Sequence, residues 1–215
     1  MGETTTTSPP PPPRPSPFSH ELHTALREMA SKGAVKATPL SQLKGFFPVR
    51  TVKKKGGGVR LISNLRRTNR ALRSQRFKME DLTDVVFAVG AAHAEGKTVT
   101  HAACIDVKDA FLHVPLSPHF EKYLGFSVGD KWYRATALPF GLQSSPLVWQ
   151  RFVNVVLARV RAKGVVACVH VDDLVLLGSS ADEVARAVNT VLHELVDAGI
   201  LPNLPKSTSP TPVDQ

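Results

Sequence analysis

An apolar stretch interrupted by two adjacent carboxylates constrains the fold of this chain more than any other feature. Residues 165–177 have the sequence VVACVHVDDLVLL, in which Asp172 and Asp173 interrupt a nearly continuous apolar run. Two short apolar segments around a polar dipeptide predict a buried β-hairpin. A buried carboxylate is costly without a compensating cation, and a divalent metal ion is an efficient one. The alternative is that Asp172 and Asp173 form only the polar turn of the hairpin.

A second acidic cluster has the same form. Residues 101–112 have the sequence HAACIDVKDAFL, in which Asp106 ends a strand-like apolar run and Asp109 is placed to cap the next turn. If this strand neighbours the first hairpin, Asp106, Asp172 and Asp173 converge at one sheet edge. Three converging carboxylates are a ligand set for two Mg²⁺ ions, with Mn²⁺ as a substitute, and such ion pairs promote phosphoryl transfer.

Positive charge is concentrated in one segment. Residues 44–78 contain 12 Lys or Arg and no acid, which leaves 15 basic and 18 acidic residues in the rest of the 215-residue chain. A block of this density favours a polyanionic partner, with nucleic acid preferred to an acidic membrane surface. A solvated basic face without a specific partner is the alternative.

The remaining composition is that of a folded chain, since 42% of the residues are hydrophobic. No apolar run approaches the roughly 20 residues of a membrane span, and no secretion signal follows Met1. We therefore expect an intracellular protein of the nucleus or cytoplasm, not secreted and without stable membrane association. Cys104 and Cys168 are expected to be free thiols. The Pro- and Thr-rich residues 1–19 and the tail 207–215 are expected to be disordered.

Hydrophobic periodicity predicts a mixture of helices and strands without strict alternation, which favours the α+β class. Helices are predicted at 20–32, 79–90, 145–162 and 181–198. Strands are predicted at 46–52, 59–63, 100–107, 123–128, 131–135, 165–171 and 174–177. Lys53, Lys54 and Lys55 precede three glycines between the first two strands, which indicates a basic hairpin with a flexible tip.

Five motifs occur in the order found in one known family. They are RLISNLRRTN at 60–69, IDVKDAF at 105–111, LPFGLQSSP at 138–146, HVDD at 170–173 and NLPKS at 203–207. Over about residues 22–206 the chain resembles reverse transcriptases, most closely those of retrotransposons of the tyrosine-recombinase (DIRS-like) group. The resemblance implies a right-handed polymerase fold with fingers at 20–81 and 114–144. The palm would comprise 82–113 and 145–206, with a ferredoxin-like antiparallel sheet and packed helices.

The resemblance also implies catalytic roles. Asp106, Asp172 and Asp173 would bind the two metal ions, and Lys206 would donate a proton to the leaving pyrophosphate. Phe111 would occupy the steric-gate position that excludes a ribose 2′-hydroxyl. By residue type alone, Phe111 could equally be a core aromatic and Lys206 a surface charge.

Substrate-binding roles follow from the same resemblance. Arg60 and a lysine of the hairpin (Lys53, Lys54 or Lys55) would bind the incoming triphosphate, for which cationic side chains are suited. Phe140 and Gly141 belong to the motif that positions template and nucleotide. The alternatives are generic phosphate contacts for the basic residues and a plain turn for Gly141.

The expected function is template-directed DNA synthesis, in which dNTPs are added to a primer 3′-hydroxyl on RNA and DNA templates. The chain departs from the family in having His170 where Tyr is usual and Asn64 where an acid is common. It ends soon after Lys206, with no thumb, ribonuclease H or recombinase region expected. The alternative functions are a catalytically inactive, nucleic-acid-binding remnant and an unrelated RNA-binding domain. The oligomeric state is left open.

Overall fold

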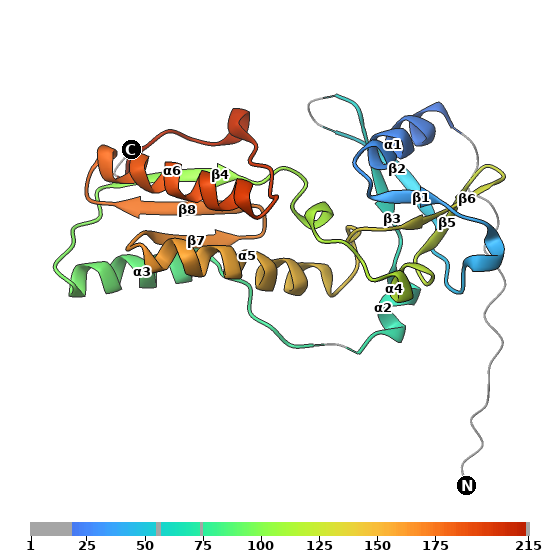
Figure 1. Ribbon diagram of the computed structural model, residues 1–215, viewed down its shortest axis with the longest axis horizontal. Helices are drawn as coiled ribbons and strands as arrows, with labels where there is room; N and C mark the ends of the chain where they lie inside the picture. The colour runs from blue at the N-terminus through green and yellow to red at the C-terminus, as the bar shows by residue number, and fades with distance from the viewer. Residues whose placement is uncertain (1–18, 55–56, 74, 214–215) are drawn as a thin grey trace, which may run out of the picture. The chain divides into compact units, whose positions relative to one another are not determined.

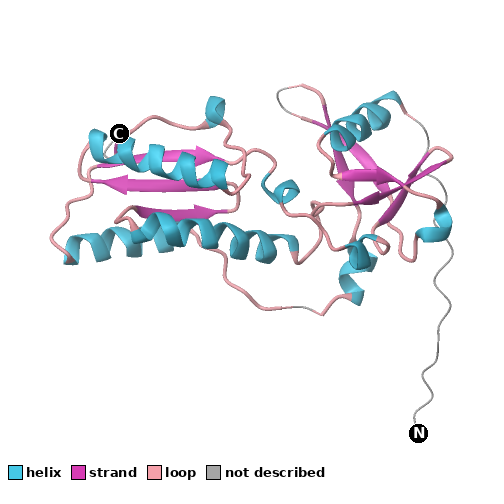
Figure 2. Cartoon of the chain, viewed as in Figure 1, coloured by secondary structure: helices cyan, strands magenta, loops and turns pink. Residues whose placement is uncertain are grey.

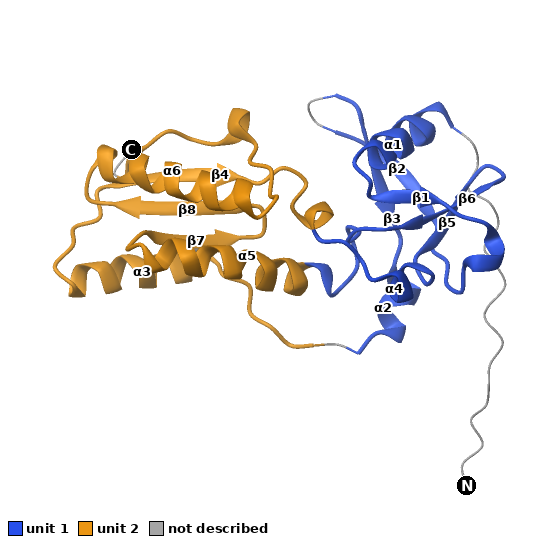
Figure 3. Ribbon diagram, in the orientation of Figure 1, with its two compact units in different colours: residues 1–74, 114–145 blue, residues 75–113, 146–215 orange. Residues whose placement is uncertain are grey.

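The computed structural model of the chain describes residues 19–54, 57–73 and 75–213. It divides into two compact units, coloured separately in Figure 3. Unit 1 comprises residues 1–74 and 114–145, and unit 2 comprises 75–113 and 146–215. The sequence predicts changes of unit after 81, 113 and 144, whereas the structure has them after 74, 113 and 145. The predicted disordered arm at 1–19 lies outside the described residues, except for Ser19.

Unit 2 contains a four-stranded antiparallel sheet in the order β7-β8-β4-β9. Strands β4, β7 and β8 are labelled in Figure 1 and drawn as arrows in Figure 2. Its strands are β4 (His101–Asp106), β7 (Val166–His170), β8 (Asp173–Gly178) and β9 (Thr211–Pro212). Helix α5 (Ser145–Ala162) precedes β7, and the segment 114–145 between β4 and α5 belongs to unit 1. Helix α6 (Ala181–Asp197) lies between β8 and β9. This βαββαβ order with an antiparallel sheet is the ferredoxin-like arrangement. The α+β class and the predicted palm architecture are therefore confirmed.

Helix α6 of unit 2 covers the sheet through an apolar face. In α6 the buried residues Val184, Ala187, Val191 and Leu195 recur at intervals of three and four, and the helix packs against β4 and β8. Helix α3 (Leu82–Ala94) packs against β7.

The start of α3 corrects the sequence prediction, which places the helix from residue 79. Asp81 is the N-cap: its side chain accepts a hydrogen bond from the Thr83 N–H at 2.8 Å. The Asp84 carboxylate in turn accepts one from the Asp81 N–H at 2.9 Å. This capping box satisfies backbone donors at the first turn and stops the helix from extending to Met79.

The tail also differs from its prediction. Residues 207–213 are described and are not disordered, since β9 pairs with the start of β4, with His101 opposite Pro212 and Ala102 opposite Thr211. The Thr208 hydroxyl accepts a hydrogen bond from the Cys104 N–H at 2.8 Å. A Ser-, Thr- and Pro-rich composition predicts disorder, but pairing with a sheet edge supplies the missing backbone partners.

Unit 1 combines a three-stranded antiparallel sheet, ordered β1-β6-β5, with the hairpin β2–β3. Its strands are β1 (Val35–Ala37), β2 (Val49–Lys53), β3 (Val59–Ser63), β5 (Gly125–Val128) and β6 (Lys131–Ala135). Its helices are α1 (His20–Ser31), α2 (Arg66–Ala71), α4 (Pro118–Glu121) and the 3₁₀ turn η1 (Leu40–Gln42). The short elements β1, α2 and α4 are absent from the sequence prediction because three to six residues carry too little periodicity.

The state of the two cysteines and the apolarity of the helices are also seen in the structure. Cys104 and Cys168 are free thiols, the first half-buried and the second buried. Among the described residues, no helix combines the length and apolarity needed to cross a membrane.

Candidate active site

The structure brings the three predicted carboxylates together at one end of the unit 2 sheet. Asp106 is the last residue of β4 and Asp173 the first of β8, and the two are direct partners in the antiparallel register. Asp172 immediately precedes β8, and its carbonyl accepts a hydrogen bond from the Val107 N–H at 2.7 Å. Register pairing therefore places residues from two separate motifs side by side.

The turn that contains Asp172 has a strained backbone. His170 and Asp173 are strand partners, so β7 and β8 are joined by the two residues Val171 and Asp172. Val171 has φ 54°, a left-handed conformation that strains a β-branched residue. The buried Trp149 of α5 donates its indole N–H to the Val171 carbonyl. Packing and hydrogen bonding from α5 thus support a turn that its own sequence disfavours.

Asp106 is oriented by the segment around the 3₁₀ turn η3 (Leu204–Lys206). The Asn203 side-chain amide donates to the Asp106 carboxylate, and the Asn203 N–H donates to the Asp106 carbonyl at 2.7 Å. The Ser207 hydroxyl accepts from the Asp106 N–H at 3.2 Å. Asn203 and Ser207 belong to the NLPKS motif, in which the sequence predicts a role only for Lys206.

Burial and the closeness of the three carboxylates change the pKa values of groups at this end of the sheet. Burial raises the pKa of the Asp172 carboxyl, and the negative charges of Asp173 and Asp106 raise it further, whereas the Lys206 ammonium acts in the opposite direction. Burial and Asp173 likewise raise the pKa of the Cys104 thiol to about 11, so this thiol is protonated at neutral pH. The site therefore has an excess of negative charge that a bound cation would relieve.

This donor set is suitable for Mg²⁺, which prefers carboxylate oxygens. The observation that supports the fit is that Asp106 and Asp173 are strand partners beside Asp172, where burial and then the neighbouring negative charges raise the pKa of the Asp172 carboxyl. Among the described residues, however, no three His, Cys, Asp or Glu side chains are already arranged as a metal site. The carboxylates are neighbours in the fold without forming a closed coordination shell.

His170, which replaces the usual Tyr, is bound by a residue that the sequence did not single out. Its Nδ1 lies 2.7 Å from the Glu80 carbonyl, which fits an N–H donor. The Glu80 carboxylate accepts from the Val169 N–H at 2.9 Å and pairs with Arg161 at 3.3 Å. Arg161 Nε also donates to the Ala167 carbonyl at 2.9 Å. Since β7 is an edge strand, these side chains satisfy backbone groups that a neighbouring strand would otherwise pair.

Phe111 lies in the 3₁₀ turn η2 (Ala110–His113) of unit 2, with 7% of its surface exposed. This burial suits a core aromatic, and the gate role stays a prediction. Two residues later, His113 has Nδ1 3.3 Å from the Ala110 carbonyl, and its Nε2 accepts from the Leu201 N–H at 3.0 Å. Burial lowers the pKa of His113, which keeps the imidazole neutral as these two bonds require.

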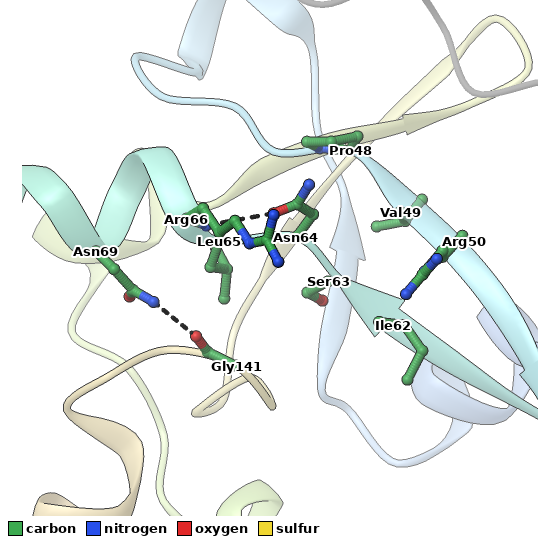
Figure 4. A pocket seen from close by; sticks show the side chains of 10 residues that line it. All are labelled: Pro48, Val49, Arg50, Ile62, Ser63, Asn64, Leu65, Arg66, Asn69 and Gly141. Carbon is green, nitrogen blue, oxygen red and sulfur yellow. Dashed lines mark hydrogen bonds between the residues drawn. The ribbon is translucent and has the colours of Figure 1, made fainter.

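Gly141 lies at a cavity of about 480 Å³ in unit 1. Figure 4 shows the side chains that line it, which come from β2, β3, α2 and the 138–146 motif. The Asn69 amide donates to the Gly141 carbonyl at 2.9 Å, and the Asn69 side-chain oxygen accepts from the Gln143 N–H at 3.0 Å. Gly141 has φ 92°, and a Cβ there would lie 3.1 Å from the Ser63 carbonyl oxygen. Only glycine meets both conditions without strain.

The same cavity is also lined by further polar side chains. Asn64, found where an acid is common, accepts a long 3.5 Å hydrogen bond from the Arg66 N–H through its side-chain oxygen. Arg50 and Arg66 add positive charge to the wall. A cavity of this kind, with cations, amides and an exposed backbone turn, suits a nucleotide with its phosphate.

The predicted triphosphate-binding residues also belong to unit 1. Lys53 ends β2 and the exposed Arg60 lies in β3, where it is the strand partner of Val52. The Lys54 ammonium lies 3.4 Å from Glu28 of α1. Lys55 lies outside the described residues. Phe140 is 41% exposed, beside Gly141.

Comparison with known proteins agrees with these observations. Residues 52–212 match the family described as "Reverse transcriptase (RNA-dependent DNA polymerase)". The chain is 30% identical over 211 residues to the Gag-Pro-Pol polyprotein of Human T-cell leukemia virus 3 (strain 2026ND), covering 91% of this chain and 14% of the relative. It is 28% identical over 141 residues to the Pol polyprotein of the Drosophila melanogaster transposon gypsy, covering 66% of this chain and 13% of the relative.

Among solved structures, the protease-reverse transcriptase of Prototype Foamy Virus is similar in fold. The TM-score is 0.75 at 21% identity, over 96% of this chain and 26% of the other. A foamy viral protease-reverse transcriptase in complex with double-stranded DNA gives the same TM-score at 19% identity, over 95% of this chain and 34% of the other. The chain belongs to the reverse transcriptase family and has its fingers and palm fold. It spans about a seventh of the length of these two curated relatives.

Proposed function

We propose that this chain is the catalytic core of a retroelement polymerase that adds dNTPs to a primer 3′-hydroxyl on RNA and DNA templates. The observation that carries the proposal is the strand pairing of Asp106 with Asp173, beside Asp172, in a chain of the reverse transcriptase family. We assign the element to the tyrosine-recombinase (DIRS-like) group of retrotransposons on the form of its motifs.

The three carboxylates would bind two Mg²⁺ ions, with Mn²⁺ as a substitute. When bound, such ions stabilise the charges that develop on the attacking and leaving oxygens. Asn203 fixes one oxygen of Asp106 through its amide, which leaves the other available for ligation. The Lys206 ammonium, whose charge already acts on Asp172, would donate a proton to the leaving pyrophosphate.

The residues of unit 1 would bind the substrates. Arg60 and the lysines at 53–55 would contact the triphosphate, because arginine offers a bidentate fork and lysine a point charge. The cavity beside Gly141 would accept the template nucleotide, with Phe140 next to it. Phe111 would exclude nucleotides that carry a ribose 2′-hydroxyl. The match to a structure determined with double-stranded DNA supports a primer and template as the partners.

Single-nucleotide extension of a labelled DNA primer on an RNA template, with Mg²⁺ or Mn²⁺, tests this function. The matched variant is Asp172→Asn, which keeps the size of the side chain and removes its charge. We expect extension by the wild type only, and nearly equal affinity of both proteins for the duplex, because the basic residues are unchanged.

The alternative function makes a different prediction in the same experiment. A nucleic-acid-binding remnant would bind the duplex in a salt-sensitive manner without extending the primer. A parallel loss of duplex affinity in Asp172→Asn would contradict the assignment of Asp172 to catalysis, since a metal ligand is not needed for backbone phosphate contacts.

A further inference from the structure

Unit 1 contains a second cavity, of about 500 Å³, that the proposed catalytic roles do not use. It shares Pro48 with the cavity beside Gly141, and the two are lined by consecutive residues of α2, Arg66 in the first and Arg67 in the second. The side chains that define the chemistry of the second cavity are Lys44, Phe46, Arg67, His119, Phe120 and Tyr123.

The wall of this cavity is formed by a close backbone contact between two distant segments. The Lys44 N–H donates to the Lys122 carbonyl at 2.7 Å, and the Gly125 N–H donates to the Gly45 carbonyl at 3.0 Å. A Cβ at Gly45 would lie 2.5 Å from the Tyr123 carbonyl oxygen, a distance that no side chain tolerates. Glycine at position 45 is therefore required for the approach that brings Phe46 and Tyr123 to the same cavity.

The aromatic residues of the cavity are held by further rings and remain partly accessible. Phe46 packs edge-on against Trp132, with ring centroids 5.2 Å apart. Tyr123 packs edge-on against His119 at 6.2 Å and keeps 37% of its surface exposed. The Lys122 ammonium lies 5.3 Å from the centre of the Tyr123 ring. Rings that are oriented and still exposed are suitable for stacking a planar group.

The charge of the cavity is entirely positive. Lys44 and Arg67 line it, no Asp or Glu does so among the described residues, and both cations belong to the acid-free segment 44–78. Within the part of the chain that the structure describes, neither cation forms an ion pair with an acidic side chain. Cations next to accessible aromatic rings match the phosphate and base of an unpaired nucleotide.

We propose that this second cavity, defined by Lys44, Phe46, Arg67 and Tyr123, binds an unpaired nucleotide of the single-stranded 5′ extension of the template. The base stacks on the aromatic wall and its phosphate contacts Lys44 or Arg67. The proposal rests on the polymerase function proposed above. Because the two cavities share Pro48 and adjoin along α2, one strand can pass from the second cavity to the first. Stacking tolerates any base, so the site has no sequence preference.

Fluorescence anisotropy of the full chain on two primer–templates tests the proposal. One substrate has a template overhang of a single nucleotide, and the other has the same duplex with a long overhang of arbitrary sequence. The variants are Tyr123→Leu, which removes the ring, and Arg67→Ala, which removes a cation. Arg70→Ala is the matched control, since Arg70 is an exposed arginine of the same helix that lines neither cavity.

We expect Tyr123→Leu and Arg67→Ala to bind the long overhang about tenfold more weakly, with almost unchanged affinity for the short one. For the long overhang, the slope of log affinity against log salt concentration should also fall by about 1 in Arg67→Ala, because one phosphate contact is lost. Arg70→Ala should affect both substrates equally. Equal losses on both substrates, or no loss, in a folded Arg67→Ala variant would overturn the proposal.

The same substrates separate this proposal from the polymerase function. If no primer is extended but the two variants still lose affinity only for the long overhang, the polymerase function fails and the cavity assignment stands. If primers are extended and overhang length makes no difference to any variant, the cavity assignment alone fails.

Discussion

The two units of this protein present charge in opposite ways. In unit 2, three acids are crowded at a sheet end, and the Asn203 amide holds the carboxylate of Asp106. In unit 1, cations such as Arg60 and Arg67 are exposed and line open cavities or strand surfaces. Acids that bind metal ions need fixed geometry, whereas cations that contact phosphates need reach and exposure. The difference predicts that mutations in unit 2 affect chemistry or stability and those in unit 1 affect binding.

Removal of one charge in each unit is expected to give the largest effects. Asp106→Asn is expected to reduce single-nucleotide incorporation by about 10³-fold, since loss of a metal ligand removes several kcal/mol of transition-state stabilisation. Arg60→Ala is expected to raise the KM for dNTP about tenfold with a smaller effect on kcat, as for one charge-assisted hydrogen bond. Pre-steady-state kinetics measure both, and a mainly KM effect in Asp106→Asn would break the comparison.

Phe111 tests whether a buried residue of unit 2 also checks the substrate. Phe111→Ala is expected to lower the free energy of unfolding by about 3 kcal/mol, because it leaves a cavity in the core. It is also expected to admit ribonucleotides, as measured by the ratio of kcat/KM for dNTP and NTP. Phe111→Leu, which keeps most of the volume, serves as the folded control. If neither variant changes sugar discrimination, Phe111 is only a core residue.

Glu80 tests how strongly the edge of β7 depends on side chains. Glu80→Gln is expected to lower the free energy of unfolding by about 1 kcal/mol, because a partly buried carboxylate pairs with Arg161 and accepts from the Val169 N–H. Urea unfolding measures the change. Glu95→Gln, which breaks the exposed pair with Lys97, should shift stability by less than about 0.5 kcal/mol. Equal effects of the two substitutions would show that Glu80 is an ordinary surface acid.

The smallest expected effect concerns pH and His113. The folded pKa of His113 lies below its usual value, because burial disfavours the charged form. As the pH falls, the unfolded chain therefore takes up this proton before the folded chain does. The contribution of neutral His113 to the free energy of unfolding is fully present above about pH 6.5 and is lost as the pH falls towards the folded pKa. Unfolding at pH 7.5 and 5.5 should show a larger acid-induced loss in the wild type than in His113→Gln. The opposite order would contradict a neutral His113.

Much of the fold was predictable where apolar periodicity is strong. The strand Lys131–Ala135 and the helix Ser145–Ala162 have the predicted bounds, and the β7–β8 hairpin lies where the sequence places it. The start of α3 was predicted too early, and the tail that contains β9 was predicted to be disordered. Both predictions are wrong because a capping box and pairing with a sheet edge depend on hydrogen bonds, which the hydrophobic pattern does not indicate.

The candidate site shows the same division. Asp106, Asp172 and Asp173 were identified from sequence, because charged residues inside apolar strands are conspicuous. Glu80 was not, and Asn203 was noted only as part of the NLPKS motif, because the role of a polar residue in a loop is unknown until its partner is known. The need for glycine at position 45 was likewise not apparent from the sequence, because it arises from the close approach of the Tyr123 backbone, which excludes a side chain there.

Residue order alone is enough to predict the α+β class, the acids within apolar strands and the concentration of positive charge at 44–78. The folded chain was needed to show that Asp106 pairs with Asp173, that the 207–213 tail adds a strand to a sheet, and that Phe46 and Tyr123 share a cavity with Arg67. Strand register and cavities arise from contacts between distant segments, and the free energy of those contacts is gained only when the chain is folded.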